Sequence, residues 1–298
     1  MKKKGERKVF YMLMFSILVA IFLISLVSAG VLDWFKKTIT GKVPQNMSIS
    51  VAGINPAQIT YVSVPSRYAV ILTTIPVIFE VHMYDADGVS DLNDVSVSAN
   101  FTKTGETPKL SGPCSWINDI NAYAANYSCS IDMNYWDADG IWNVGVQGVD
   151  LGNLTYQHNT TTTFNYGVTR SMDIYPNPLI WPSITSGANN QKATTPLTIN
   201  NSGNYDGIIQ INALDLLGAD LVGSITADKF NISIADDCFG TTLNNGTFTN
   251  ITNSNSNPGN LAGGGGKANL YYCIPLVPSI SSQEYSTRYG GSWEIKYP

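Results

Sequence analysis

The chain has 298 residues, which is enough for one large domain or two of ordinary size. A hydrophobic content of 44% can supply a core, so the composition excludes a disordered chain. The formal net charge is −5, although a basic cluster stands at the N-terminus, so the rest of the chain is more acidic than the total shows. An acidic chain repels phosphate, and we therefore expect no nucleic-acid partner.

The N-terminus has the order of a secretory signal peptide. A basic cluster (Lys2, Lys3, Lys4, Arg7 and Lys8) precedes an apolar run over residues 9–27, and Ser-Ala-Gly follows. We expect cleavage after Ala29, so that 1–29 is the signal. The run is also long enough to span a bilayer, which makes an uncleaved anchor the alternative, and Lys4-Gly5 resembles the processing site of a type IV pilin-like leader. With a signal or an anchor, residues 30–298 are extracellular, secreted or held at the cell surface, and the N-terminal segment is the only membrane contact.

Residues 30–45 are expected to form a linker that ends near Pro44. Beyond it, over 46–167, short runs rich in β-branched and aromatic residues are separated by turn residues. Such runs predict strands of a β-sandwich rather than βαβ units. The predicted strands lie at 68–84, 94–102, 127–136, 141–150 and 155–167.

A second series of predicted strands fills 168–298. Its runs lie at 171–184, 195–204, 207–218, 229–238, 268–277 and 291–298. Between them, residues 241–266 contain few apolar side chains and many Asn, Thr and Gly, which predicts a long flexible loop. The fold class is therefore all-β, with two tandem immunoglobulin-like β-sandwich domains at 46–167 and 168–298.

Four cysteines in an exported chain predict disulfide bonds. The four cysteines can form two disulfides in three ways, and proximity in the sequence favours Cys114–Cys129 and Cys238–Cys273. Metal binding by these thiols is disfavoured because no Cys-x-x-Cys occurs and only His82 and His158 could assist. Sequons for N-glycosylation agree with a surface protein; they stand at Asn46, Asn100, Asn126, Asn153, Asn159, Asn200, Asn231, Asn245 and Asn250.

Two segments carry a resemblance to a known family. Residues 79–102 ("FEVHMYDADGVSDLNDVSVSANFT") and 137–153 ("DADGIWNVGVQGVDLGN") resemble the immunoglobulin-like and cadherin-like modules of prokaryotic surface proteins. Residues 196–204 and 271–286 resemble related modules more faintly, and the signal followed by "DWFKKTITGKV" looks like exported proteins of archaea. The resemblance implies a β-sandwich fold and a place at the cell surface, and says little about a ligand.

The sequence Asp-Ala-Asp-Gly occurs twice, at 85–88 and 137–140. An EF-hand is excluded, because Ser90 and Ser96 stand where its sixth-position Gly and twelfth-position Glu should be. A looser calcium site formed by Asp85, Asp87, Asp91 and Asp94 remains open. The competing interpretation is that each copy is a tight turn at the end of a strand, because Asp-Gly is a common turn dipeptide. No cofactor other than calcium is suggested.

No catalytic signature is present, so we expect a protein that is not an enzyme and name no catalytic residue. The Gly-rich run at 263–266 lacks the residues of a phosphate-binding loop. Aromatic residues near the C-terminus could stack on sugar rings, although core packing explains most of them; they are Tyr271, Tyr272, Tyr285, Tyr289, Trp293 and Tyr297.

Together these features predict a non-enzymatic structural or adhesive component of the cell surface. Its partners would be other surface proteins or surface glycans, or further copies of the same chain. Two alternatives stay open. One is a carbohydrate- or calcium-dependent binding module, and the other is a subunit of a pilus, sheath or surface layer assembled by pairing of edge strands.

Overall fold

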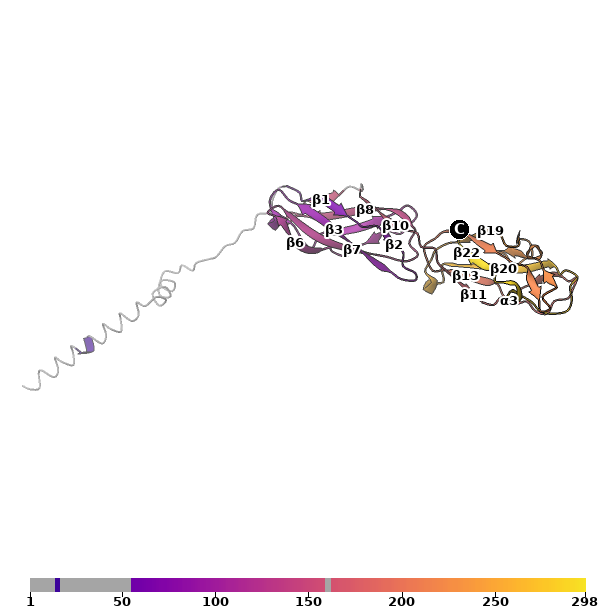
Figure 1. Ribbon diagram of the computed structural model, residues 1–298. Helices are drawn as coiled ribbons and strands as arrows, with labels where there is room; N and C mark the ends of the chain where they lie inside the picture. The colour runs from indigo at the N-terminus through magenta and orange to yellow at the C-terminus, as the bar shows by residue number, and fades with distance from the viewer. Residues whose placement is uncertain (1–13, 17–54, 159–161) are drawn as a thin grey trace, which may run out of the picture. The chain divides into compact units, whose positions relative to one another are not determined.

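The computed structural model describes residues 14–16, 55–158 and 162–298. The described chain is all-β, with a few single-turn helices (Figure 1). Residues 52–298 form one compact unit. The expected signal or anchor (1–29) and linker (30–45) lie outside the described residues, apart from the short helical piece at 14–16. Among the described residues, no helix has the length and apolar character needed to cross a membrane.

Two antiparallel-rich sheets make up residues 58–167. The first has the strand order β1 (Gln58–Ser63), β3 (Ile75–Tyr84), β7 (Ala124–Met133) and β6 (Ser115–Asn121). The second has the order β2 (Arg67–Tyr68), β10 (Thr163–Gly167), β8 (Gly140–Val149), β4 (Ser98–Thr102) and β5 (Lys109–Leu110), and β9 (Thr155–His158) also pairs with β8.

Alternation of side chains explains why these two sheets share a core. On β3 the inward residues Val77, Val81 and Met83 are fully buried. On β8 the inward residues Trp142 and Val144 belong to the same hydrophobic cluster. Because successive side chains of a strand point to opposite faces, each sheet presents one apolar face, and the two faces enclose this first core.

Residues 172–296 contain three further sheets. The largest has the order β11 (Met172–Tyr175), β13 (Leu197–Asn201), β20 (Lys267–Leu276), β17 (Asn231–Ser233) and β18 (Thr241–Thr242), with β12 (Asn189–Lys192) on β20. The second consists of β19 (Thr249–Ser256), β14 (Gly207–Asn212) and β22 (Glu294–Lys296), and the third of β16 (Ser224–Ile225), β15 (Leu216–Gly218) and β21 (Tyr285–Ser286). The single-turn helices are η1 (Val89–Asp91), η2 (Ala227–Lys229), η3 (Leu261–Gly263) and α3 (Thr287–Gly290).

A second hydrophobic cluster, separate from the first, lies among these sheets. Its centre is aromatic: the ring of Phe230 meets Trp181 edge-on at 5.7 Å and Trp293 at 5.1 Å between centroids. Tyr272 lies 6.1 Å from Trp293. The two contacts of Phe230 are edge-to-face, a favoured aromatic geometry, whereas the rings of Tyr272 and Trp293 are tilted by 31°.

The expectation of a long flexible loop at 241–266 was wrong. This segment contributes β18, β19 and η3, and β19 pairs with β14. Ile251 on β19 is fully buried, and Ser254 and Ser256 also point inward. Their hydroxyls are satisfied there: Ser254 donates to the Ile251 carbonyl at 2.7 Å, and Ser256 lies 2.8 Å from the hydroxyl of Tyr297. Because two of the three buried positions of β19 are serines, the strand lacks the alternating apolar pattern by which the others were predicted.

The long predicted strand at 68–84 is also shorter than expected. The ladder begins at Ile75, whereas residues 70–73 form a tight turn in which the Thr73 amide donates to the Val70 carbonyl at 3.0 Å. Leu72 in this turn has φ +54°, which lies outside the extended region of a regular strand.

Both cysteine pairs are the ones that proximity favours. Cys114 and Cys129 form a disulfide with a Cα–Cα distance of 4.4 Å, and Cys238 and Cys273 form the other at 5.2 Å. Cys114 immediately precedes β6 and Cys129 lies on the neighbouring strand β7, so this bond crosses one hairpin rather than joining the two sheets.

Candidate functional site

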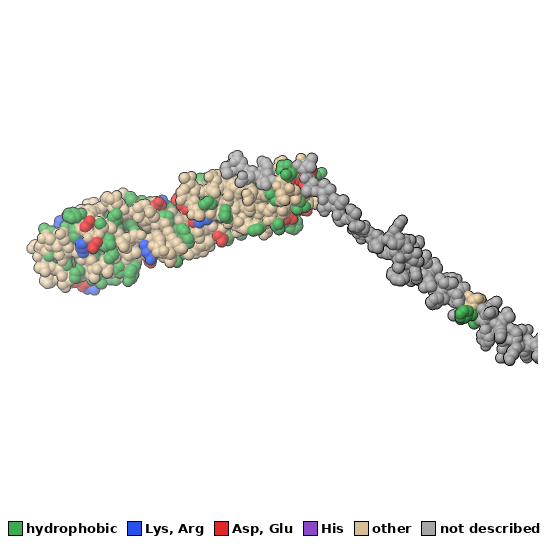
Figure 2. Space-filling model, turned by 180° about the vertical axis from the view of Figure 1, so that it is seen from behind, with side chains coloured by type: hydrophobic (Ala, Val, Ile, Leu, Met, Phe, Trp, Pro, Cys, Tyr) green, Lys and Arg blue, Asp and Glu red, His purple; other side chains and the backbone are tan. Residues whose placement is uncertain are grey.

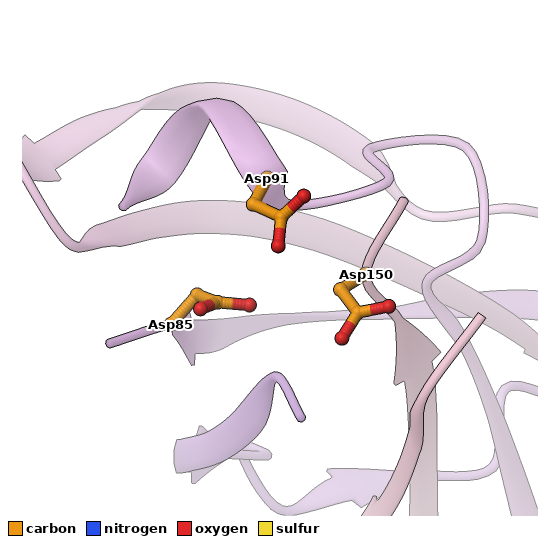
Figure 3. Close-up of side chains that lie close together, drawn as sticks. All are labelled: Asp85, Asp91 and Asp150. Carbon is orange, nitrogen blue, oxygen red and sulfur yellow. The ribbon is translucent and has the colours of Figure 1, made fainter. Parts of the chain in front are cut away.

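Three buried aspartates, Asp85, Asp91 and Asp150, converge at one end of the first core. Asp85 directly follows β3, Asp150 directly follows β8, and Asp91 ends η1. Each contributes one carboxylate oxygen to a group whose members all lie within 4.8 Å of one another. Figure 3 shows the three side chains lying close together. We call this group the aspartate cluster.

Local backbone structure explains how the chain reaches this arrangement. Gly88 adopts φ +112°, a conformation that favours glycine, and its amide donates to the Asp85 carbonyl at 3.2 Å. This turn redirects the chain from β3 into η1. The Asp85 amide then donates to the Tyr123 carbonyl at 2.8 Å, which fixes the turn against the β6–β7 connection.

Asp150 is brought beside Asp91 by backbone pairing. Leu92 and Asp150 form an isolated antiparallel bridge, and the Leu151 amide donates to the Asp91 carbonyl at 2.8 Å. The segment after η1 is therefore held against the end of β8. Asp91 and Asp150, which are 59 positions apart in the chain, are thus set next to each other by main-chain hydrogen bonds rather than by side chains alone.

Within the aspartate cluster, two carboxylates each have one oxygen satisfied and one not. The Asp87 amide donates to Oδ1 of Asp85, and the Leu154 amide donates to Oδ1 of Asp150, both at 2.8 Å. Oδ2 of Asp85 and Oδ2 of Asp150 are buried and have no hydrogen-bond partner among the described residues. Both side chains are 0% exposed.

The surroundings of Asp85 disfavour its charge. Burial raises the pKa of the Asp85 carboxyl above its ordinary value, and the nearby carboxylates of Asp91 and Asp150 raise it further. The hydrogen bond from the Asp87 amide acts in the opposite direction. Among the groups that act on Asp85, burial and the neighbouring carboxylates thus favour the neutral form, and only the hydrogen bond from the Asp87 amide favours the charged one.

The calcium site expected from the sequence is assembled only in part. The structure brings Asp85 and Asp91 together, but the other two predicted ligands lie elsewhere. Asp87 is exposed, and its carboxylate accepts from the main-chain and side-chain nitrogens of Asn55 at 2.7 and 3.0 Å. Asp94 is exposed and accepts a 2.7 Å hydrogen bond from the Tyr127 hydroxyl. Their place is taken by Asp150, and its position as the last residue of the strand predicted at 141–150 was the available signal.

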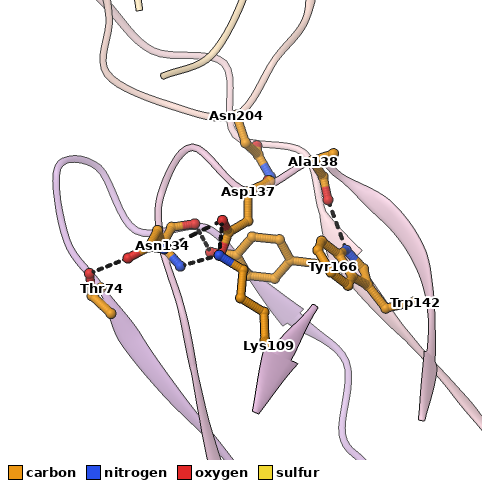
Figure 4. Close-up of polar contacts among 8 residues, drawn as sticks. All are labelled: Thr74, Lys109, Asn134, Asp137, Ala138, Trp142, Tyr166 and Asn204. Atoms are coloured by element: carbon orange, nitrogen blue, oxygen red, sulfur yellow. Dashed lines mark hydrogen bonds and ion pairs between the residues drawn. The ribbon is translucent and has the colours of Figure 1, made fainter. Parts of the chain in front are cut away.

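The second Asp-Ala-Asp-Gly copy has a different environment (Figure 4). Asp137 is 2% exposed, but its Oδ1 lies 2.5 Å from the Lys109 ammonium, and its Oδ2 accepts from the Asn134 amide at 2.6 Å. The Asn204 side chain donates to the Asp137 carbonyl at 3.3 Å. The first aspartate of each copy is buried, and in the described ranges an ion pair with a cation is recorded for Asp137 but not for Asp85.

The turn interpretation of the second copy agrees with the backbone. Gly140 has φ +95° and begins β8, two residues before Trp142. The indole nitrogen of the buried Trp142 donates to the Ala138 carbonyl at 2.9 Å, and this hydrogen bond links the turn to the first core.

The two histidines, the Gly-rich run and the C-terminal aromatic residues were also considered as candidate site residues. His82 lies on β3 and stacks on Tyr61 at 4.5 Å between centroids, and the side chain of His158 lies outside the described residues. The glycines at 263–266 follow Asn260, whose side chain caps η3.

The C-terminal aromatic residues are buried or half-buried, with Tyr272 and Tyr297 innermost, so they form no exposed stacking strip.

The sequons divide by environment. Asn153, Asn245 and Asn250 are exposed, whereas the half-buried group lies on strands and consists of Asn100, Asn126, Asn200 and Asn231. Asn46 and Asn159 lie outside the described residues. On the face shown in Figure 2, charged side chains of both signs are few and scattered among polar and apolar ones.

These features define an all-β protein with two disulfides and a buried aspartate cluster. No protein-family model matches the chain, and no curated protein matches it in sequence. Among solved structures, the partial N-terminal region of an enterococcal surface protein is similar over 80% of this chain and 88% of that one, at 8% identity and a TM-score of 0.15. A TM-score this low does not show a shared fold.

Proposed function

We propose that the chain is a non-enzymatic structural or adhesive component of the cell surface, built from two tandem immunoglobulin-like β-sandwich domains. The observation that carries this proposal is the pair of disulfides, each formed between cysteines that are at least nine-tenths buried. Structural disulfides persist in oxidising compartments outside the cytoplasm. The basic and apolar N-terminal sequence provides a route to that compartment.

Two separate hydrophobic cores support the tandem arrangement. Each core is enclosed by antiparallel-rich sheets, as in β-sandwich modules of extracellular proteins. Such modules serve mainly to hold surfaces at a distance and to present loops and strand edges. Exposed sequons on the same unit suit a surface that carries glycans.

Protease digestion of intact cells that carry the protein tests this proposal. We expect residues of the compact unit to be cut without lysis, and we expect a maleimide reagent to label no cysteine before reduction and all four afterwards. Protection from protease until lysis, together with free thiols in the native protein, would contradict the surface assignment.

Assembly through strand edges is the second candidate function. β6 is an edge strand whose residues are all exposed, and Trp116, Ile117 and Ile120 are each more than 40% exposed. An exposed edge with apolar side chains is a surface on which another strand can pair. Its ladder with β7 has two register shifts, which limit the regular length available to a partner. Light scattering on the native chain and on an Ile117→Lys variant tests assembly through this edge. An assembly larger than one chain that the substitution dissociates supports this function.

A further inference from the structure

We propose that the aspartate cluster is a calcium site formed by Asp85, Asp91 and Asp150, and that the ion cross-links the two sheets around the first core. The proposal goes beyond the surface role and does not depend on it. It rests on the convergence of three buried carboxylates and on two buried oxygens that have no hydrogen-bond partner in the described part of the chain.

The unsatisfied oxygens point to a ligand. Oδ1 of Asp85 and Oδ1 of Asp150 are each engaged by a backbone amide, which fixes the plane of each carboxylate. Oδ2 of both is buried and has no donor among the described residues. A buried anionic oxygen without a partner is costly, and buried charges in proteins are paired or bind metal ions.

Within the described ranges, no ion pair with a basic side chain is recorded for Asp85 or Asp150. The comparison with the second Asp-Ala-Asp-Gly copy is direct, because there Lys109 neutralises the equivalent buried Asp137. Where the second copy has a lysine, the first copy has two more carboxylates, so the missing partner is a cation.

The donor set selects the kind of cation. All three side chains offer oxygen, with no nitrogen or sulfur in the group, which suits a hard divalent ion. Oxygens bound to one calcium ion at about 2.3–2.6 Å can be up to about 5 Å apart, and the group fits within 4.8 Å. Magnesium demands near-ideal octahedral geometry and retains several waters, a poor match to three carboxylates held at this depth.

The position of the ion explains what it would do. Asp85 follows β3 of one sheet and Asp150 follows β8 of the other, and both are the first residue after their strand. An ion held by both therefore ties the sheets together at one end of the core. The nearby disulfide does not perform this task, because Cys114 and Cys129 belong to neighbouring strands of one hairpin. Asp91 adds η1 to the same anchor.

Calorimetric titration of the purified, metal-stripped full chain with calcium chloride tests the proposal, with magnesium chloride in parallel. We expect one calcium ion per chain, binding that a chelator reverses, and a rise in Tm of about 3–10 °C at a calcium concentration about 10–100 times the Kd. No saturable calcium binding, or an equal response to magnesium, would overturn it.

Substitutions locate the ion. Asp85→Asn and Asp150→Asn each remove one charge with little change of shape, and both should abolish calcium binding and the rise in Tm. In chelator their Tm should equal or exceed that of the native chain, because repulsion within the cluster is relieved. The matched control is Asp139→Asn, which changes the exposed aspartate of the second copy and should bind calcium as the native chain does. Unchanged binding by the Asp85 and Asp150 variants would overturn the site, and if neither variant folds, the titration of the native chain decides.

Discussion

The ammonium of Lys109 lies 2.5 Å from Oδ1 of Asp137, and this ion pair satisfies a carboxylate that is 2% exposed. The lysine side chain is itself only 18% exposed, so the pair is largely shielded from water. Removing one partner of a buried pair leaves the other as an uncompensated charge, which costs more than the pair contributes.

Lys109→Met should therefore lower the free energy of unfolding by about 2–4 kcal/mol, measured by urea denaturation. The matched control is Lys192→Met, whose ion pair with Asp236 is exposed on both sides and should contribute less than about 1 kcal/mol. Adding Asp137→Asn to the Lys109 variant should recover part of the loss, because the buried charge is then gone. Equal, small effects of the two lysine variants would contradict this account of Asp137.

The disulfides should differ in the stability that they provide. The Cys114–Cys129 bond closes a separation of 15 residues and the Cys238–Cys273 bond one of 35. Loop-closure entropy predicts losses of about 3 and about 4 kcal/mol when each pair is replaced by alanine. Urea denaturation of the two double variants measures both values. A loss from the shorter loop that clearly exceeds the loss from the longer one would show that packing around Cys129 outweighs chain entropy.

Ile251 tests whether β19 is part of the second core. Its side chain is fully buried, so Ile251→Ala should destabilise the protein by about 2–4 kcal/mol. Asn250, the exposed neighbour on the same strand, provides the control, and Asn250→Ala should change stability by less than about 1 kcal/mol. Thermal unfolding of both variants gives the comparison. Equal stability of the two would mean that this strand adds little to the fold.

Glycan occupancy should follow the exposure of the sequons. We expect glycans at Asn153 and Asn245, which are exposed, and none at Asn126 or Asn231, which are half-buried on strands. Asn231 is further engaged: its side chain donates to the Cys238 carbonyl at 3.0 Å and accepts from Thr242. Mass spectrometry of peptides from the native protein measures each site. Occupancy at Asn231 would contradict the packing of β17 against β18.

The regular strands of the first core were predictable because their inward positions are apolar. On β8, Trp142, Val144 and Val146 alternate with polar or small residues, and the period of two is visible in the sequence. β19 was not predictable in this way. Ser254 and Ser256 occupy two of its inward positions, and only the tertiary structure supplies their hydrogen-bond partners.

The aspartate cluster was half predictable for a similar reason. Asp85 and Asp91 are close in sequence, so their proximity followed from a turn. Asp150 joins them through the bridge to Leu92, which depends on how β3 and β8 are placed in different sheets. Sequence spacing cannot report that placement, and it wrongly favoured Asp87 and Asp94, which are nearer in the chain but lie on the outer side of their turns.

The two disulfides also set how far the chain can be stretched. When a protein is pulled from its ends, a disulfide removes the residues that it encloses from the length that unfolding can release. At about 3.5 Å per extended residue, the enclosed segments of 15 and 35 residues withhold roughly 50 and 120 Å. In its oxidised form the protein can therefore be extended less far than its sequence length allows. Reduction of both disulfides would increase the contour length of the unfolded chain by roughly 170 Å.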